Sequence, residues 1–238
     1  MVLGGSRRSD GNGAVGRNGR PAGVPISRAL EIRPGIANDD LREAVAAINR
    51  VHGTGDLPSI PMAMRGVLVN SAGEPVDGLF SADETPDGRY LAQSIQIRSG
   101  ASHRPLVTLH EIGHFLDLHG LPGSRFASAD TKVSPLADWR RAVLQSRAVG
   151  VLAAVGQVEN PVVRQRAERL IVVEELWARS YAQFVVIRGG TEALRESLRA
   201  LRRHESGDLS LPRQWDDDDF VDIEIAIDQL FRRLGWIA

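Results

Sequence analysis

The chain has 238 residues, a formal net charge of −1 and a hydrophobic content of 42%, which is enough for a substantial core. The balanced charge provides no overall basic field, so we expect no nucleic-acid partner. The absence of cysteine excludes disulfide scaffolds and thiolate zinc sites, and any metal must be held by His, Asp or Glu.

Residues 1–25 are rich in Gly, Arg, Ser and Asn and contain few apolar side chains. We therefore expect a flexible leader ahead of one folded domain over residues 26–238. The leader lacks the apolar core of a secretory signal. No apolar run in the chain approaches the ~18–20 residues of a membrane span, so we expect no membrane partner.

The folded part is expected to begin with one helix and several strands. Asn38 is the predicted N-cap of a helix that runs to about His52. Residues 60–70 are rich in β-branched and apolar side chains and predict a strand. A second strand-like segment follows at Leu79 and Phe80.

Residues 89–98 predict a further strand, because polar and apolar side chains alternate within residues 93–98. A short connection over residues 99–104 joins it to the next predicted helix. This strand is compatible with a sheet edge beside a catalytic cleft, where an extended peptide can bind as an added strand. An ordinary edge strand that its Gln and Arg side chains protect is the alternative.

The next helix carries the most informative pattern of the chain. Residues 106–118 are apolar almost all round, and the run ends at Gly120, which predicts a buried helix. His110 and His114 are four residues apart, so their imidazoles project from one face and can converge on one Zn²⁺. Glu111 lies about 100° round the helix, where its carboxylate can act as a general base without being a ligand.

Asp117 shares the face of the two histidines on this helix. A buried polar face needs partners, and a metal would satisfy both imidazoles at once. We expect the Asp117 carboxylate to accept the second ring N–H of a ligating histidine and to hold that ring in place.

A catalytic zinc normally has three protein ligands, so the chain must supply a third. After a polar loop over residues 122–135 and a helix from about Leu136, a long helix is predicted over residues 161–188. It contains Glu174 and Glu175. Glu175 shares its face with Ala178 and other small residues that allow close helix packing, so it is preferred over Glu174, for which an ion pair is the alternative.

The remaining chain predicts an amphipathic helix over residues 191–204 and another over residues 220–234. The carboxylates of residues 216–219 precede the second helix and are expected to cap it, with a calcium site as the minor alternative. Together these patterns predict a single α+β domain, mainly helical, with a small sheet beside the histidine helix.

The pattern His110-Glu111-x-x-His114, followed by Glu175-x-x-Ala178-Arg179, resembles the gluzincins, the glutamate-ligand branch of the zincin metallopeptidases. It is also similar to zincin-like domains of phage-encoded proteins and of bacterial toxin or effector proteins. The gap between His114 and Glu175 is longer than in thermolysin-like enzymes, which implies an inserted helix. The third histidine of the metzincin branch is absent, because Gly120 stands in its place.

The resemblance implies a zinc metallopeptidase in which His110, His114 and Glu175 are the ligands. Zinc would polarise the scissile carbonyl and acidify a water, and Glu111 would take the proton and deliver it to the leaving nitrogen. A polypeptide substrate is likewise an implication of the resemblance. Tyr181, Arg179 and His204 are equal candidates for stabilising the oxyanion, and each is more often a packing or surface residue.

Two alternatives belong to other functional classes. The domain could be a non-catalytic binding module that keeps zinc as a structural element, or a structural phage-type component without turnover. The intact Glu111 argues against both, because a purely structural site gains nothing from a base beside an open coordination position. A cytoplasmic protein is the simplest expectation, and delivery by a phage particle or a secretion system is the alternative.

Overall fold

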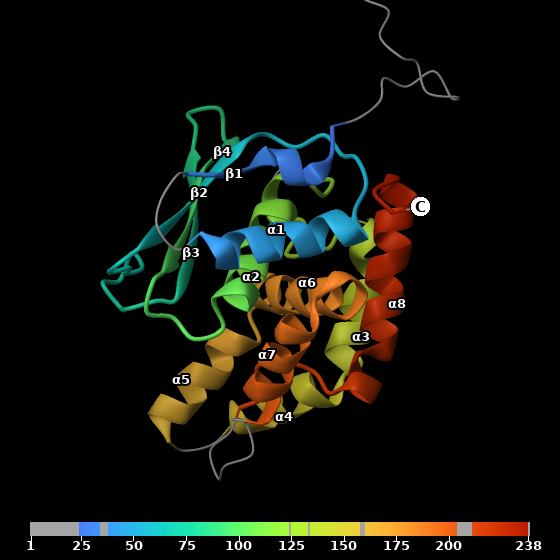
Figure 1. Cartoon of the computed structure of the whole chain (residues 1–238). Coiled ribbons are helices and arrows are strands. Elements are labelled where there is room, and N and C mark those ends of the chain that lie inside the picture. The colour runs from blue at the N-terminus through green and yellow to red at the C-terminus, as the bar shows by residue number, and fades with distance from the viewer. Residues whose placement is uncertain are drawn as a thin grey trace, which may run out of the picture.

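The computed structural model describes residues 24–33, 38–123, 125–132, 134–157, 160–203 and 211–237, so residues 1–23 of the predicted leader lie outside it. Within these ranges the chain has an α+β fold that combines eight α-helices with one four-stranded mixed sheet (Figure 1). The prediction of a mainly helical α+β architecture is confirmed. None of the described helices combines the length and apolar character that crossing a membrane requires.

The sheet has the strand order β1-β2-β4-β3. Its strands are β1 (Leu30–Ile32), β2 (Ile60–Arg65), β3 (Gly78–Glu84) and β4 (Tyr90–Arg98). Strands β1, β2 and β4 run parallel to one another, and β3 pairs antiparallel with β4. The predicted strand over residues 89–98 is therefore β4, but it lies inside the sheet. The expectation that it forms an edge was wrong, because β3 pairs with its outer side and is one of the two edge strands.

The helices are α1 (Asp39–Val51), α2 (Arg104–His119), α3 (Ala137–Gln145), α4 (Arg147–Val155), α5 (Pro161–Leu170), α6 (Val173–Gly189), α7 (Glu192–Arg203) and α8 (Asp217–Leu234). Two 3-10 helices, η1 (Ile26–Ala29) and η2 (Ser134–Leu136), precede β1 and α3. In Figure 1, α2 lies between the sheet and α6, α1 packs against both α2 and α6, and α8 lies beyond α6. The histidine helix is thus central to the fold.

The helix predicted over residues 161–188 is two helices. The chain is extended at Val172, between the end of α5 and the start of α6. The guanidinium group of Arg179 donates a hydrogen bond to the carbonyl of Leu170, the last residue of α5. A buried side chain of α6 thus supplies a donor to a carbonyl that has no partner within its own helix. The strand predicted over residues 60–70 is also shorter, since β2 ends at Arg65.

At two predicted helix caps, the side chains make other hydrogen bonds than expected. Asn38 occupies the N-cap position of α1, but its side chain donates to the Arg33 carbonyl and makes no capping bond. Of the carboxylates at residues 216–219, Asp219 accepts hydrogen bonds from the backbone of Arg147 and Ala148. It therefore satisfies amides at the start of α4, a helix that the sequence did not separate from α3.

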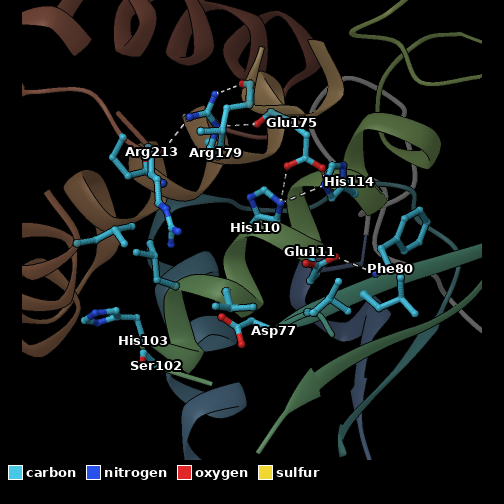
Figure 2. Close-up of a pocket in the computed structure, with 18 of the residues that line it drawn as sticks. Asp77, Phe80, Ser102, His103, His110, Glu111, His114, Glu175, Arg179 and Arg213 are labelled. Carbon is cyan, nitrogen blue, oxygen red and sulfur yellow. Dashed lines mark hydrogen bonds and ion pairs between the residues drawn. The ribbon is translucent and has the colours of Figure 1, made fainter. Parts of the chain in front are cut away.

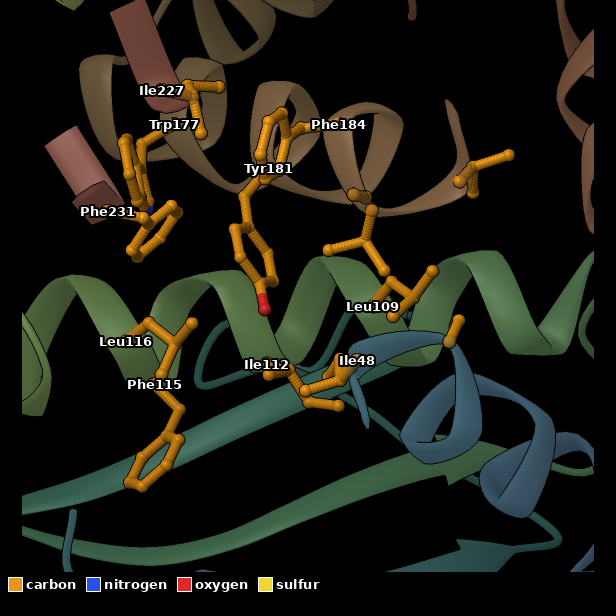
Figure 3. Packing of buried hydrophobic residues seen from close by; sticks show 14 of the residues in the cluster. Ile48, Leu109, Ile112, Phe115, Leu116, Trp177, Tyr181, Phe184, Ile227 and Phe231 are labelled. Carbon is orange, nitrogen blue, oxygen red and sulfur yellow. The ribbon is translucent and has the colours of Figure 1, made fainter. Parts of the chain in front are cut away.

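The contact between α2 and α6 forms the centre of the core (Figure 3). Leu109, Ile112 and Leu116 of α2 are fully buried, and so are the aromatic rings of Trp177 and Tyr181 of α6. Burial of apolar surface on this scale is the main stabilising term of the fold. The two histidines of α2 face Glu175 at the start of α6, and Glu111 of α2 faces β3.

Candidate metal centre

Helix α2 fixes His110 and His114 on one face, as their spacing predicts. Their ring centres are 4.8 Å apart, and the Nε2 atoms of the two rings are 3.2 Å apart. Both side chains are largely enclosed, with 22% of His110 and 13% of His114 exposed. The two nitrogen atoms therefore point to one position at the surface of the helix (Figure 2).

Glu175, in the first turn of α6, completes a triangle of donor atoms. Its Oε2 lies 3.3 Å from Nε2 of His110, and its Oε1 lies 3.3 Å from Nε2 of His114. Tetrahedral zinc with bonds of about 2.0–2.1 Å separates its ligand atoms by about 3.3 Å. The spacing and chemical type of these three donors therefore fit zinc.

Of the two adjacent glutamates, only Glu175 belongs to the cluster of potential ligand atoms formed by the described residues. The close approach of α6 to α2 explains this choice, because a methyl group added to Gly113 would lie 2.9 Å from the Cα of Ala178. The small residues that the sequence places on the Glu175 face thus do allow close packing. The role of Glu175 as a ligand remains a prediction.

The three groups also form a coupled electrostatic unit. Burial alone raises the pKa of Glu175, but the hydrogen bonds and charges of His110 and His114 hold it well below its ordinary value. Burial lowers the pKa of His114, and the neighbouring carboxylates of Glu175 and Glu111 outweigh that effect and raise it. An ionised carboxylate beside two imidazoles is a suitable donor set for a divalent cation.

Glu111 lies beside this triangle and not within it. Its Oε2 accepts a hydrogen bond of 2.8 Å from the backbone N–H of Phe80 on β3. Only 6% of the residue is exposed, and this burial raises the pKa of its carboxyl group despite the charges of His110 and His114. A buried carboxyl group beside the donor triangle is a candidate general base.

The hydrogen-bond partners of Asp117 lie in the loop after α2. Its two carboxylate oxygens accept hydrogen bonds from Ser128, from the backbone N–H at 2.7 Å and from the hydroxyl at 2.5 Å. Arg140 in turn donates to the Ser128 carbonyl at 2.9 Å. The loop after α2 thus supplies the donors to this carboxylate, and a supporting role of Asp117 beside a ligating histidine stays a prediction. Burial raises the pKa of Asp117 to about 6.

The three residues considered for stabilising the oxyanion occupy different places in the structure. Tyr181 is fully buried in the core, and its hydroxyl lies 3.2 Å from Nε2 of His52, so it does not reach the site. Arg179 lines the site, but its guanidinium donates to the carbonyls of Glu175, Leu170 and the segment at 212–213. Arg179 therefore joins chain segments. His204 lies outside the described residues.

The donor triangle opens into a groove of about 640 Å³ (Figure 2). One wall comes from β3 and the loop before it, and the other comes from α5 and residues 213–214. Apart from the site itself, its lining combines apolar and polar or charged side chains in similar numbers. The apolar members are Val76, Leu79, Phe80, Leu106, Val107, Phe126, Leu170 and Leu201, and the polar or charged ones are Asn70, Asp77, Ser102, His103, Arg166, Arg179, Arg213 and Gln214. The groove can accept an extended ligand beside the metal centre.

Two residues of β3, Gly78 and Phe80, contact Glu111 and were not identified from the sequence. A glycine within a strand is a known sign of a close backbone approach, and Gly78 carried that signal. The partner could not be deduced, because the pairing of β3 with α2 depends on the whole sheet.

The chain matches no protein-family model, and no curated protein or solved structure is significantly similar to it. The residues of the site and the motifs that contain them are therefore the basis for a functional proposal.

Proposed function

We propose that this protein is a zinc-dependent metallopeptidase in which His110, His114 and Glu175 hold the metal and Glu111 is the general base. The observation that carries the proposal is the triangle of donor atoms, with separations of 3.2 and 3.3 Å, directly beside a second, buried carboxylate. Catalytic zinc sites have three protein ligands and one open position, whereas structural sites have four protein ligands.

When bound, zinc supplies a Lewis acid that polarises a carbonyl group and makes a water molecule acidic near neutral pH. The residues of the chain provide the remaining chemistry. Glu111 accepts a proton from the water that attacks the scissile carbonyl, and its conjugate acid then donates a proton to the leaving nitrogen. Its position beside the donor triangle, with one oxygen held by the Phe80 N–H, suits both transfers.

A polypeptide substrate is supported by the groove and by the edge strand β3. An extended peptide that lies along β3 could form backbone hydrogen bonds with groups of this edge other than the Phe80 N–H, which donates to Glu111. The groove brings such a peptide past Glu111 and the two histidines, since all of them line it. The resemblance of the two motifs to gluzincins points to the same substrate class.

The proposal is tested by incubating a mixture of peptides from a digested proteome with the zinc-loaded protein and identifying new termini by mass spectrometry. A parallel sample contains a chelator, and both are repeated with His114→Ala. We expect cleavage only in the zinc-loaded wild-type sample. Cleavage that survives both chelation and His114→Ala would exclude this site as its source.

A further inference from the structure

Strand β3 contacts the proposed general base at two alternate residues, Gly78 and Phe80. The Phe80 N–H donates to Oε2 of Glu111 at 2.8 Å. Gly78 faces the same carboxylate. A methyl group added to Gly78 would lie 2.7 Å from Cγ and 2.8 Å from Cδ of Glu111, and closer still to Oε1. Carbon atoms in contact are normally about 3.5–4.0 Å apart, so any side chain here would displace the carboxylate by about 1 Å.

The backbone conformation does not explain the glycine. Gly78 lies within β3, opposite Ile97 of β4, and it is not one of the described glycines with a positive φ. A glycine inside a strand weakens the strand, because it has no side chain to pack and loses more conformational freedom on folding. The space it leaves for Glu111 is the one local feature that requires it.

We propose that Gly78 and the Phe80 amide are positioning elements for Glu111, and that β3 thereby sets the orientation of the base. This inference depends on the proposed function for its effect on turnover, but the positioning itself is a property of the fold. A displacement of about 1 Å at a reacting group can cost about 10²-fold in rate. Neither residue needs to touch the substrate to have that effect.

The first test is kinetic and uses Gly78→Ala, with Gly66→Ala as the matched control. Gly66 follows β2, and a methyl group there would meet no atom within 4 Å. We expect Gly78→Ala to lose about 10²-fold in kcat/KM while its zinc content stays that of the wild type. Gly66→Ala should keep wild-type activity. Wild-type activity in Gly78→Ala would overturn the inference.

The second test asks whether the loss passes through Glu111. Shortening the base with Glu111→Asp withdraws its carboxylate from Gly78 by one methylene group. Adding Gly78→Ala to Glu111→Asp should then cost less than about 3-fold, because the clash is gone. If Gly78→Ala lowers kcat/KM as much in Glu111→Asp as it does in the wild type, Gly78 has only a general structural role. If Gly78→Ala unfolds the protein and Glu111→Asp restores folding, the coupling is demonstrated without kinetics.

A third readout does not depend on turnover or on metal. In the metal-free protein, the amide NMR signal of Phe80 should change in Glu111→Ala, which removes the acceptor, and in Gly78→Ala, which displaces it. Gly66→Ala should leave the signal unchanged. An unchanged Phe80 signal in Gly78→Ala would contradict the positioning. If the Phe80 signal changes in both Glu111→Ala and Gly78→Ala but the wild-type protein cleaves no peptide, the positioning is upheld and the proposed function is rejected.

Discussion

Gly113 on α2 and Ala178 on α6 are in such close contact that a methyl group on Gly113 would lie 2.9 Å from the Ala178 Cα. The Nε1 atom of Trp177 also donates to the Gly113 carbonyl at 3.0 Å. Gly113 adjoins His114 in the sequence, and Glu175 precedes Ala178 by about one turn of α6. The distance between the two helices therefore sets the distance between the proposed ligands.

We predict that Gly113→Ala destabilises the fold by about 1–3 kcal/mol, because the added methyl group has no space, and that it also weakens zinc binding. Gly150→Ala is the matched control, since Gly150 lies in α4 and a methyl group there would meet no atom within 4 Å. The control should gain up to about 1 kcal/mol from helix propensity. Urea denaturation and zinc titration measure both effects, and equal stability of the two variants would refute the prediction.

The two adjacent glutamates provide a direct comparison. Glu175→Ala should weaken zinc binding by more than about 100-fold, because a direct ligand contributes more than the supporting residues whose loss costs 10–100-fold. Glu174→Ala should change the affinity little, since Glu174 is not in the donor cluster. Competition with a chromophoric chelator gives both affinities. The reverse ranking would assign the third ligand to Glu174.

Asp117 should stabilise the loop after α2 and contribute little to metal binding. Removing the hydroxyl donor with Ser128→Ala leaves a buried carboxylate with one partner fewer and should cost about 1–3 kcal/mol of unfolding free energy. Because the two residues act through one contact, Asp117→Asn and Ser128→Ala should be less than additive when combined. A 10–100-fold loss of zinc affinity in Asp117→Asn, with stability retained, would instead support the role expected from the sequence.

His52 predicts how stability depends on pH. Only 4% of the residue is exposed, and burial lowers its pKa from 6.5 to about 4. The unfolded chain then binds a proton that the folded chain does not, so the folded state loses stability as the pH falls from about 6.5 toward 4. The loss from this residue by pH 4.5 is about 2–3 kcal/mol.

The contribution is isolated by comparing the metal-free wild type with His52→Gln across this pH range. Asp117 has a pKa raised to about 6, so its effect has the opposite sign, and the comparison cancels it because both proteins contain it. The variant should be less stable at neutral pH, since His52 packs against Phe231 with ring centres 4.6 Å apart. Its unfolding free energy should fall less steeply on acidification. Parallel curves would disprove the prediction.

The sequence predicted the parts of the site that local geometry determines. His110, Glu111 and His114 share about one helical turn, so a correct helix prediction fixes their relative directions. Glu175 could be preferred over Glu174 because small residues share its face and helices approach most closely at small residues. The four-stranded sheet was anticipated only as separate strands.

The remaining features depend on contacts between distant segments. Residues 89–98 were expected at a sheet edge, but β3 lies at that edge and β4 lies inside the sheet. The order of strands in a sheet cannot be read from the alternation of polar and apolar residues within one strand. Ser128, the partner of Asp117, lies in a loop without periodicity. Tyr181 could not be assigned because α6 is buried all round from Leu176 to Val186, so the pattern gives no preferred face.

The central claim is tested most directly by measuring peptide hydrolysis by the wild type and by Glu111→Gln side by side, together with the zinc content of each. Glutamine has the same shape as glutamate but cannot take the proton from water. We predict equal zinc content and a loss of ~10²–10⁴-fold in hydrolysis. Equal cleavage by both proteins would assign the activity to another site or to a contaminant, and zinc-loaded wild-type protein that cleaves nothing would identify a non-catalytic binding module.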